Sequence, residues 1–215
     1  MDNKQKKLII LIHGFNRSAK DMQFWKTQLS AIANTDIVTP DLPTTFKSFE
    51  SCLDKLEYLL ESYKVESYSE VYVAGHSMGG LLAREYLQKK KFPNVKYLVC
   101  VGTPHAGSKL ADIALMLPFV GKIWKPLHAL KTTARQKLTT PNIPDLKIGV
   151  IVSINNGDWL GKIFLSQNSD GRVESFSAHA SDAQVIAYVN SKHAGMQYDS
   201  AVTLLIEKFF CTGNF

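Results

Sequence analysis

The chain has 215 residues, of which 45% are hydrophobic and 20% charged, a composition that suits a single globular domain over 1–215 and carries no signature of disorder. Its formal charge of +6 comes from dispersed lysines. Because no nucleic-acid motif accompanies them, they indicate a basic surface rather than a nucleic-acid partner. Cys52, Cys100 and Cys211 form neither a disulfide framework nor a zinc motif, which favours a reducing, cytoplasmic location.

A basic N-terminus, Met1 to Lys7, precedes the apolar run Leu8 to Ile12. Together they resemble the start of a secretory signal, but the run ends after five residues at His13 and no small-residue cleavage site follows. A buried strand is therefore the better interpretation. No segment of the chain approaches the roughly 18 apolar residues of a spanning helix, so we expect no stable membrane insertion.

Apolar runs and amphipathic stretches alternate along the rest of the chain. The spacing of apolar residues predicts helices over 21–33, 48–63 and 201–209 and a helix after Ser77. Short apolar runs predict strands over 36–39, 71–74, 95–101, 147–154 and 184–189. Continuously apolar strands that alternate with amphipathic helices predict an α/β fold, a three-layer α/β/α sandwich with a mainly parallel sheet.

The stretch from Val71 to Arg84 contains the pattern G-x-S-x-G, with Ser77 at its centre. The pattern alone is short, but here a strand precedes it and a helix follows it, which is the context of a nucleophile elbow. Gly75 and Gly79 remove Cβ atoms on either side of the serine. The amide of Met78, at the start of the helix, would point at an oxyanion. We therefore predict Ser77 to be a nucleophile.

A serine nucleophile needs a histidine base, and the base needs an orienting carboxylate. His193 follows the last predicted strand, where a parallel sheet places ligand-binding side chains. His179, near Asp182, is the rival base. Two turn aspartates, Asp170 and Asp158, lie between the 147–154 strand and His193, and the chain order Ser, Asp, His suits either one.

The longest interval without a clear strand, 108–145, mixes apolar residues such as Leu117 and Trp124 with lysines. Two interpretations are open. The interval could be a pair of ordinary packing helices, since an apolar stripe at helical spacing usually faces the core. It could instead form a helical cap over Ser77, because it begins at the carboxyl edge of the sheet, where ligands bind.

Several short motifs give the chain a resemblance to the α/β-hydrolase superfamily, in particular to small bacterial lipases and esterases. The motifs are His13-Gly14-Phe15, Gly75-His76-Ser77-Met78-Gly79-Gly80, Gly102-Thr103-Pro104-His105-Ala106-Gly107-Ser108, Ser169-Asp170-Gly171-Arg172-Val173 and His193-Ala194-Gly195. They span most of the chain. The elbow and the Gly-Thr-Pro-His turn are the more specific of them.

This resemblance implies a triad of Ser77, Asp170 and His193, with Asp170 preferred over Asp158, and an oxyanion hole from the amides of Phe15 and Met78. It also implies a cap insertion at about 108–145 and hydrolysis of a small-molecule ester or lipid through an acyl-enzyme, without metal or organic cofactor. The alternative is a non-catalytic module that keeps the fold and binds a lipid or a protein, because fold does not determine function.

Overall fold

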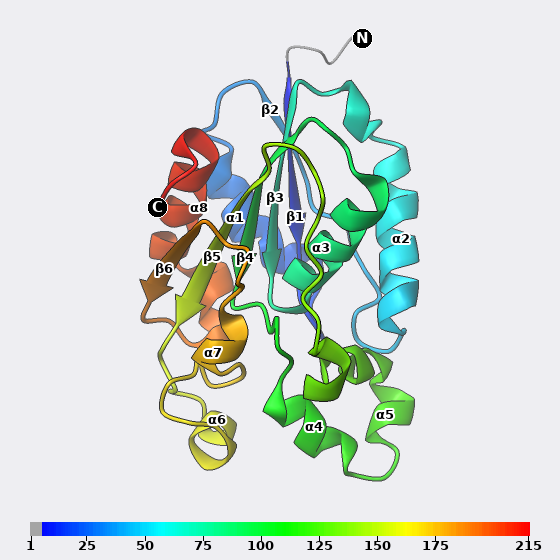
Figure 1. The fold of residues 1–215 in the computed structure, drawn as a ribbon, viewed down its shortest axis with the longest axis vertical. Helices are drawn as coiled ribbons and strands as arrows, with labels where there is room; N and C mark the ends of the chain where they lie inside the picture. The colour runs from blue at the N-terminus through cyan, green and yellow to red at the C-terminus, as the bar shows by residue number, and fades with distance from the viewer. Residues whose placement is uncertain (1–5) are drawn as a thin grey trace.

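A computed structural model of the protein describes residues 6–215, in which six parallel strands form one open sheet in the order β2-β1-β3-β4-β5-β6 (Figure 1). The strands are β1 (Lys7–Ile12), β2 (Thr35–Val38), β3 (Glu70–His76), β4 (Val95–Val101), β5 (Lys147–Ser153) and β6 (Val185–Val189). The predicted strands and the α/β/α architecture are confirmed, with ends that differ by one to a few residues. Residues 1–5, the start of the signal-like stretch, lie outside the described part.

Helices cover both faces of the sheet (Figure 1). One face packs against α2 (Phe49–Glu61) and α3 (Met78–Lys90), and the other against α1 (Gln23–Leu29) and α8 (Ser200–Thr212). Successive residues of a strand point to opposite faces. Both faces therefore need apolar residues, which explains why β1 is a continuous apolar run.

The alternation is visible in β1 itself. Leu8, Ile10 and Ile12 belong to the core beneath α2 and α3, whereas Ile9 and Leu11 belong to the core beneath α1 and α8. All five side chains are fully buried. A strand buried on both sides makes the sheet a rigid frame for whatever its ends carry.

The first predicted helix, 21–33, is shorter than its apolar spacing suggested. It begins as the 3-10 turn η1 (Ala19–Met22) and continues as α1, which ends at Leu29. The hydroxyl of Ser30 donates to the carbonyl oxygen of Thr27 at 2.6 Å. Side-chain bonds of this kind compete with the next helical turn. Ile32 still packs against the core, which is why its spacing resembled helix.

The 108–145 interval contains α4 (Lys109–Leu115), α5 (Val120–Ile123) and the 3-10 turns η3 (Lys125–Leu130) and η4 (Thr132–Arg135). In Figure 1 these elements lie at the end of the sheet to which the strand arrows point. Leu127 and Leu130 are buried in the core beneath α2 and α3, whereas Leu117 and Trp124 are exposed. Part of the interval therefore packs as core, and a cap over Ser77 stays a prediction.

The strands end in register at the carboxyl edge. Ile12 of β1 lies opposite Gly75 of β3, and His76 of β3 lies opposite Val101 of β4. The residues that follow these strands therefore emerge side by side. Segments far apart in the sequence meet there, and the predicted site residues are among them.

Candidate active site

Ser77 lies in a strained turn between β3 and α3, with φ 54° and ψ −126°. A non-glycine residue in this region is uncommon and marks a position that the surrounding structure enforces. A Cβ added to Gly75 would lie 2.5 Å from the backbone of Gly79, and one added to Gly79 would lie 2.2 Å from the carbonyl oxygen of Ile12. The two glycines of the pattern are therefore required by backbone packing on both sides of the serine.

His193 lies next to Ser77, although 116 residues separate them in the sequence. It begins the 3-10 turn η5 (His193–Tyr198), shortly after β6. Its Nε2 is 2.9 Å from the Oγ of Ser77, and its Nδ1 is 2.6 Å from Oδ2 of Asp170. Because a carboxylate only accepts hydrogen bonds, Nδ1 carries the proton in this pair, and Nε2 is left to accept from the Ser77 hydroxyl.

Asp170 is buried in a tight loop. Its Oδ1 accepts hydrogen bonds from the amides of Arg172 at 2.9 Å and Val173 at 2.8 Å, which leaves Oδ2 for His193. The amide of His193 also donates to the carbonyl oxygen of Asp170 at 2.9 Å. The acid and the imidazole are thus joined through both their side chains and their backbones.

The rival residues have other partners. Asp158 caps the short helix α6 (Trp159–Phe164) by accepting from the amide of Leu160, and it forms an ion pair with Arg172 at 2.9 Å. His179 contacts the hydroxyl of Tyr188 through its Nε2 at 2.7 Å. The structure therefore brings Ser77, His193 and Asp170 together, whereas Asp158 lies behind the acid loop, paired with Arg172 rather than with the base.

The turn after β1 lies against the serine. A Cβ added to Gly14 would be 2.9 Å from the Cβ of Ser77, so the residue before Phe15 lies against the predicted nucleophile. His13 shapes this turn, because its Nε2 accepts from the amide of Leu42 at 3.0 Å and its Nδ1 is 3.1 Å from the carbonyl oxygen of Gly14. Burial lowers the pKa of His13, which keeps the neutral ring that this pairing needs.

Met78, the other predicted oxyanion donor, is buried as the first residue of α3. Amides in the first turn of a helix have no intrahelical partner and carry the positive end of the helix dipole. The turn after β1 and the start of α3 thus place the amides of Phe15 and Met78 on the two segments that border Ser77. Their use as an oxyanion hole remains the prediction made from the resemblance.

Two residues to which sequence reasoning gave no role lie next to His193 and Asp170. His76 donates from Nε2 to the carbonyl oxygen of His193 at 3.0 Å, and burial holds its pKa well below the usual value. Gly102, at φ 55°, lies where an added Cβ would be 2.6 Å from Met196 and 3.2 Å from Oδ2 of Asp170. The motif that contains Gly102 can be recognised in the sequence. The reason why it must be a glycine is seen only in the structure, where Met196 and Asp170 leave no room for a Cβ.

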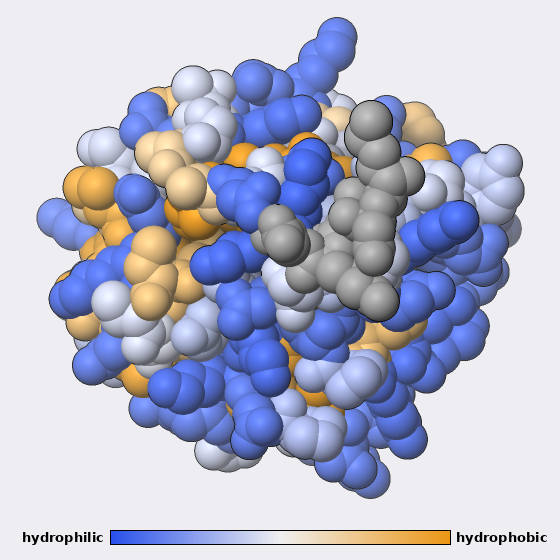
Figure 2. Space-filling view, turned by 90° about the horizontal axis from the view of Figure 1, so that it is seen from above, coloured by the Kyte–Doolittle hydropathy of each residue, from blue (hydrophilic) through white to orange (hydrophobic). Residues whose placement is uncertain are grey.

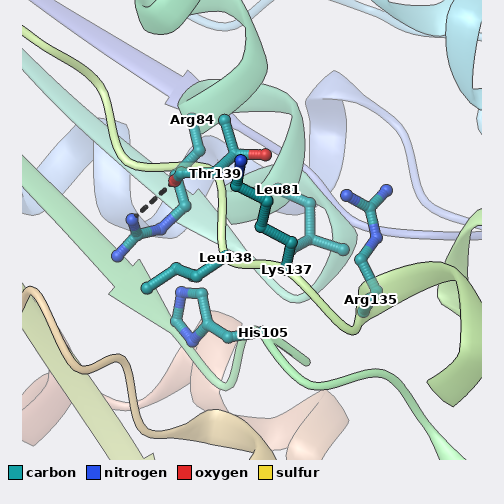
Figure 3. A pocket seen from close by; sticks show the side chains of 7 residues that line it. All are labelled: Leu81, Arg84, His105, Arg135, Lys137, Leu138 and Thr139. Atoms are coloured by element: carbon teal, nitrogen blue, oxygen red, sulfur yellow. Dashed lines mark hydrogen bonds between the residues drawn. The ribbon is translucent and has the colours of Figure 1, made fainter.

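A buried ion pair lies beneath the elbow helix. Arg84 is fully buried in α3 and donates twice to the carboxylate of Asp182, at 2.8 and 2.9 Å. It also donates to the carbonyl oxygen of Thr139 at 3.0 Å, the dashed line in Figure 3. Arg84 thereby ties the helix that begins at the nucleophile to two loops far along the chain.

The Gly-Thr-Pro-His turn after β4 holds the acid loop from the other side. The Nδ1 of His105 is 2.9 Å from the carbonyl oxygen of Ala178 in α7 (Ser175–Ala178), and the hydroxyl of Ser108 donates to the carbonyl oxygen of Arg172 at 3.1 Å. Burial, together with the charge of Arg84, lowers the pKa of His105 to about 3. His105 lines the same small cavity as Arg84 (Figure 3). It therefore acts as a neutral structural group.

Solved structures with this fold include several hydrolases. The mature lipase BlEst2 of Bacillus licheniformis is 19% identical over 98% of this chain and 92% of its own, with a TM-score of 0.70. The metagenomic carboxyl esterase MGS0156 is 13% identical over 94% and 70%, with a TM-score of 0.68. The RedJ thioesterase of Streptomyces coelicolor is 15% identical over 96% and 90%, with a TM-score of 0.59. At these identities the likeness establishes the fold.

A comparison with curated protein sequences found no match. Residues 5–159 match the protein family described as the PGAP1-like alpha/beta domain. The matched region contains Phe15, Ser77 and Met78 but ends before Asp170 and His193, so the pairing of acid and base rests on the geometry given above. Because the match covers more than half of the chain, the chain belongs to the PGAP1-like alpha/beta domain family. It has the fold of the α/β-hydrolase superfamily.

Proposed function

We propose that this protein is a serine hydrolase that cleaves carboxylic esters through an acyl-enzyme. The observation that carries the proposal is the hydrogen-bonded chain from Ser77 Oγ to His193 Nε2, at 2.9 Å, and from His193 Nδ1 to Asp170 Oδ2, at 2.6 Å. A nucleophile, a base and an orienting acid in this order are what acyl transfer by serine requires. They meet at the strained turn between β3 and α3, which is the position that a serine nucleophile occupies in an elbow of this kind.

In the acylation step, Oγ of Ser77 attacks the ester carbonyl carbon while Nε2 of His193 takes the hydroxyl proton. Asp170 holds the imidazole in orientation and stabilises the imidazolium that forms. The carbonyl oxygen gains negative charge and accepts hydrogen bonds from the amides of Phe15 and Met78. The tetrahedral intermediate then collapses, the bond to the alcohol oxygen breaks, and His193 returns the proton to the departing alcohol.

In the deacylation step, water takes the place of the alcohol. His193 removes a proton from the water as its oxygen attacks the acyl carbon of the ester on Ser77. The second intermediate expels the serine oxygen, which recovers its proton from His193, and the carboxylic acid leaves. Each proton that His193 takes is returned within the same half-reaction, so the cycle needs no metal or organic cofactor.

The substrate class is proposed from the fold relatives and the cap interval. A lipase, a carboxyl esterase and a thioesterase share this fold, and all three act on acyl groups by name. We propose an oxygen ester of a small molecule or lipid. If the cap interval borders Ser77, Leu117→Ala and Trp124→Ala shift the preferred acyl length. Both side chains are exposed, so this shift is expected with little change in melting temperature.

Labelling with a fluorophosphonate tests the proposal, because only a serine activated by a base attacks this reagent readily. We expect one adduct, at Ser77, located by mass mapping, and none on Ser77→Ala. A graded series of p-nitrophenyl esters and matched thioesters then identifies the acyl preference. Folded protein that takes up no label would refute the hydrolase and favour the alternative, a lipid- or protein-binding module.

A further inference from the structure

Most of the net positive charge of the chain comes from one stretch of the sequence. The stretch 109–137 carries five lysines and one arginine but only one aspartate, a net charge of +5 out of the +6 of the whole chain. Lysines occur elsewhere too, but acidic residues balance them there. The stretch coincides with α4, α5, η3 and η4. The elements at the carboxyl end of the sheet are therefore strongly basic.

The same stretch also exposes apolar side chains. We define the α5 rim as residues 116–124, where Met116 is 82% exposed and Leu117 61% exposed, together with the exposed Phe119, Ile123 and Trp124. The Nζ of Lys122 lies 5.4 Å from the centre of the Phe119 ring. Aromatic and aliphatic side chains interleaved with lysines are typical of segments that lie in a membrane interface.

A second apolar group lies at the same end of the molecule. The α6 rim consists of Trp159, Ile163 and Phe164, all exposed, with the exposed Lys162 among them. In Figure 1, α6 and α5 project from the carboxyl end of the sheet on opposite sides. Figure 2, which views the molecule from the opposite end, shows many hydrophilic residues there, with smaller hydrophobic patches between them and toward the left. The two rims thus distinguish the end of the molecule at which Ser77 lies.

We propose that the α5 rim and the α6 rim dock this protein on an anionic lipid surface. The apolar side chains would enter the boundary between headgroups and acyl chains, and lysines such as Lys122 and Lys125 would contact the anionic headgroups. The strong net charge favours a lipid surface over an apolar protein partner, because interfaces between proteins are depleted in lysine at their centre. The docking does not depend on the proposed function. Only the idea that the lipid surface would supply the substrate, a lipid ester, rests on it.

The docking is tested on the full-length Ser77→Ala variant, so that hydrolysis cannot alter the vesicles. Co-sedimentation is measured with vesicles of phosphatidylcholine alone and with vesicles in which part of it is replaced by phosphatidylglycerol. We expect binding to the anionic vesicles, weakened by salt. Trp124 and Trp159 are the exposed tryptophans, since Trp25 is buried. When the protein is bound, brominated lipid should therefore quench the fluorescence of these two tryptophans, which are exposed to water in the free protein.

Three double variants separate the contributions. Lys122→Gln with Lys125→Gln should lower the partition coefficient roughly thirtyfold, as expected for two lysines at an anionic surface. Met116→Ser with Leu117→Ser should lower it roughly tenfold or more. Leu204→Ser with Lys208→Gln is the matched control on α8, where Leu204 is 63% exposed and Lys208 is exposed. This control should bind as the parent does.

Equal binding to neutral and anionic vesicles would overturn the proposal, and so would a loss in the α8 control as large as in the rim variants. Absence of vesicle binding would overturn it too. If the Met116 and Leu117 changes instead convert a dimer to a monomer, the rim is an interface between copies of the chain. Vesicle binding without fluorophosphonate labelling of the wild-type protein would refute the hydrolase and leave the docking intact. Labelling of Ser77 without vesicle binding would refute the docking and leave the hydrolase intact.

Discussion

The Nε2 of His76 donates a hydrogen bond to the backbone oxygen of His193 at 3.0 Å, so the residue before the proposed nucleophile, Ser77, holds the residue that is proposed as its base. Replacing His76 by Phe keeps an aromatic ring and removes the donor. We expect kcat to fall roughly tenfold with KM nearly unchanged, because the base is displaced rather than the substrate. His128→Phe is the control, since His128 also contacts a backbone oxygen, that of Gly121, but is exposed. An equal loss in both variants would contradict the assignment.

The two candidate acids give opposite expectations. Asp170→Asn should lower kcat by about 10⁴, because an amide that donates toward Nδ1 favours the wrong tautomer of His193. Asp158→Asn should cost less than about tenfold, because it weakens an ion pair with Arg172 while an asparagine can still cap α6. Steady-state kinetics on the preferred ester compares the two. A larger loss at Asp158 would reject Asp170 as the acid.

Gly102 and Gly195 form a matched pair of glycines near the base. An alanine at Gly102 would be strained at φ 55° and would press against Met196 and Asp170, so we expect a loss of roughly 1 to 2 kcal/mol of unfolding free energy and a lower kcat. At Gly195 the nearest atom to an added Cβ is 4.0 Å away. Gly195→Ala should therefore be close to neutral in urea unfolding and in kinetics, and a reversed ranking would refute the packing described here.

Three buried histidines predict how stability depends on pH. Burial lowers the pKa values of His13, His76 and His105, so below about pH 6.5 the unfolded chain binds protons that the folded chain does not. The free energy of unfolding should therefore fall as the pH drops from about 6.5 to about 4.5, by up to roughly 1.4 kcal/mol per pH unit for each histidine. Acidic groups whose pKa is lowered, such as Asp182, change the free energy of unfolding only at lower pH. Urea titrations across this range give the slope of the free energy of unfolding against pH. His105→Asn should reduce that slope by the contribution of about one proton. A flat profile would contradict the prediction.

The pair of Arg84 and Asp182 can be tested by a double-mutant cycle. Arg84→Met removes the buried cation and leaves Asp182 without its partner, which should cost about 2 to 4 kcal/mol of unfolding free energy. Adding Asp182→Asn removes the stranded charge and should recover part of that loss. Chemical denaturation measures the three variants. If the double variant is as unstable as the sum of the two single changes, the two side chains do not interact.

Much of the fold was predictable because burial on both faces leaves a simple pattern in the sequence. The apolar runs at 8–12 and 95–101 became β1 and β4 with nearly the same ends. Helix ends were less predictable. Where α1 ends, the hydroxyl of Ser30 bonds the carbonyl oxygen of Thr27, a contact that is not visible in apolar spacing.

Parts of the candidate site were also predictable, since Ser77, Asp170 and His193 each lie in a short motif or after a strand. The support around them was not. His76 looked like an occupant of the elbow, and nothing local indicated that it would reach His193, 117 residues away. His13 likewise shapes its turn through Leu42. Such contacts depend on which strands become neighbours, and no single segment of the sequence contains that information.

The order of the strands in the sheet also has a consequence during synthesis. The elbow is complete once β1, β3 and β4 have paired, all of which come from the first 101 residues, whereas Asp170 and His193 follow β5 and β6. A nascent chain that has emerged only as far as β4 therefore holds Ser77 without Asp170 and His193. Under the proposed function, Ser77 gains its base only after β6 has been synthesised, so a chain that has emerged only as far as β4 would not yet hydrolyse esters.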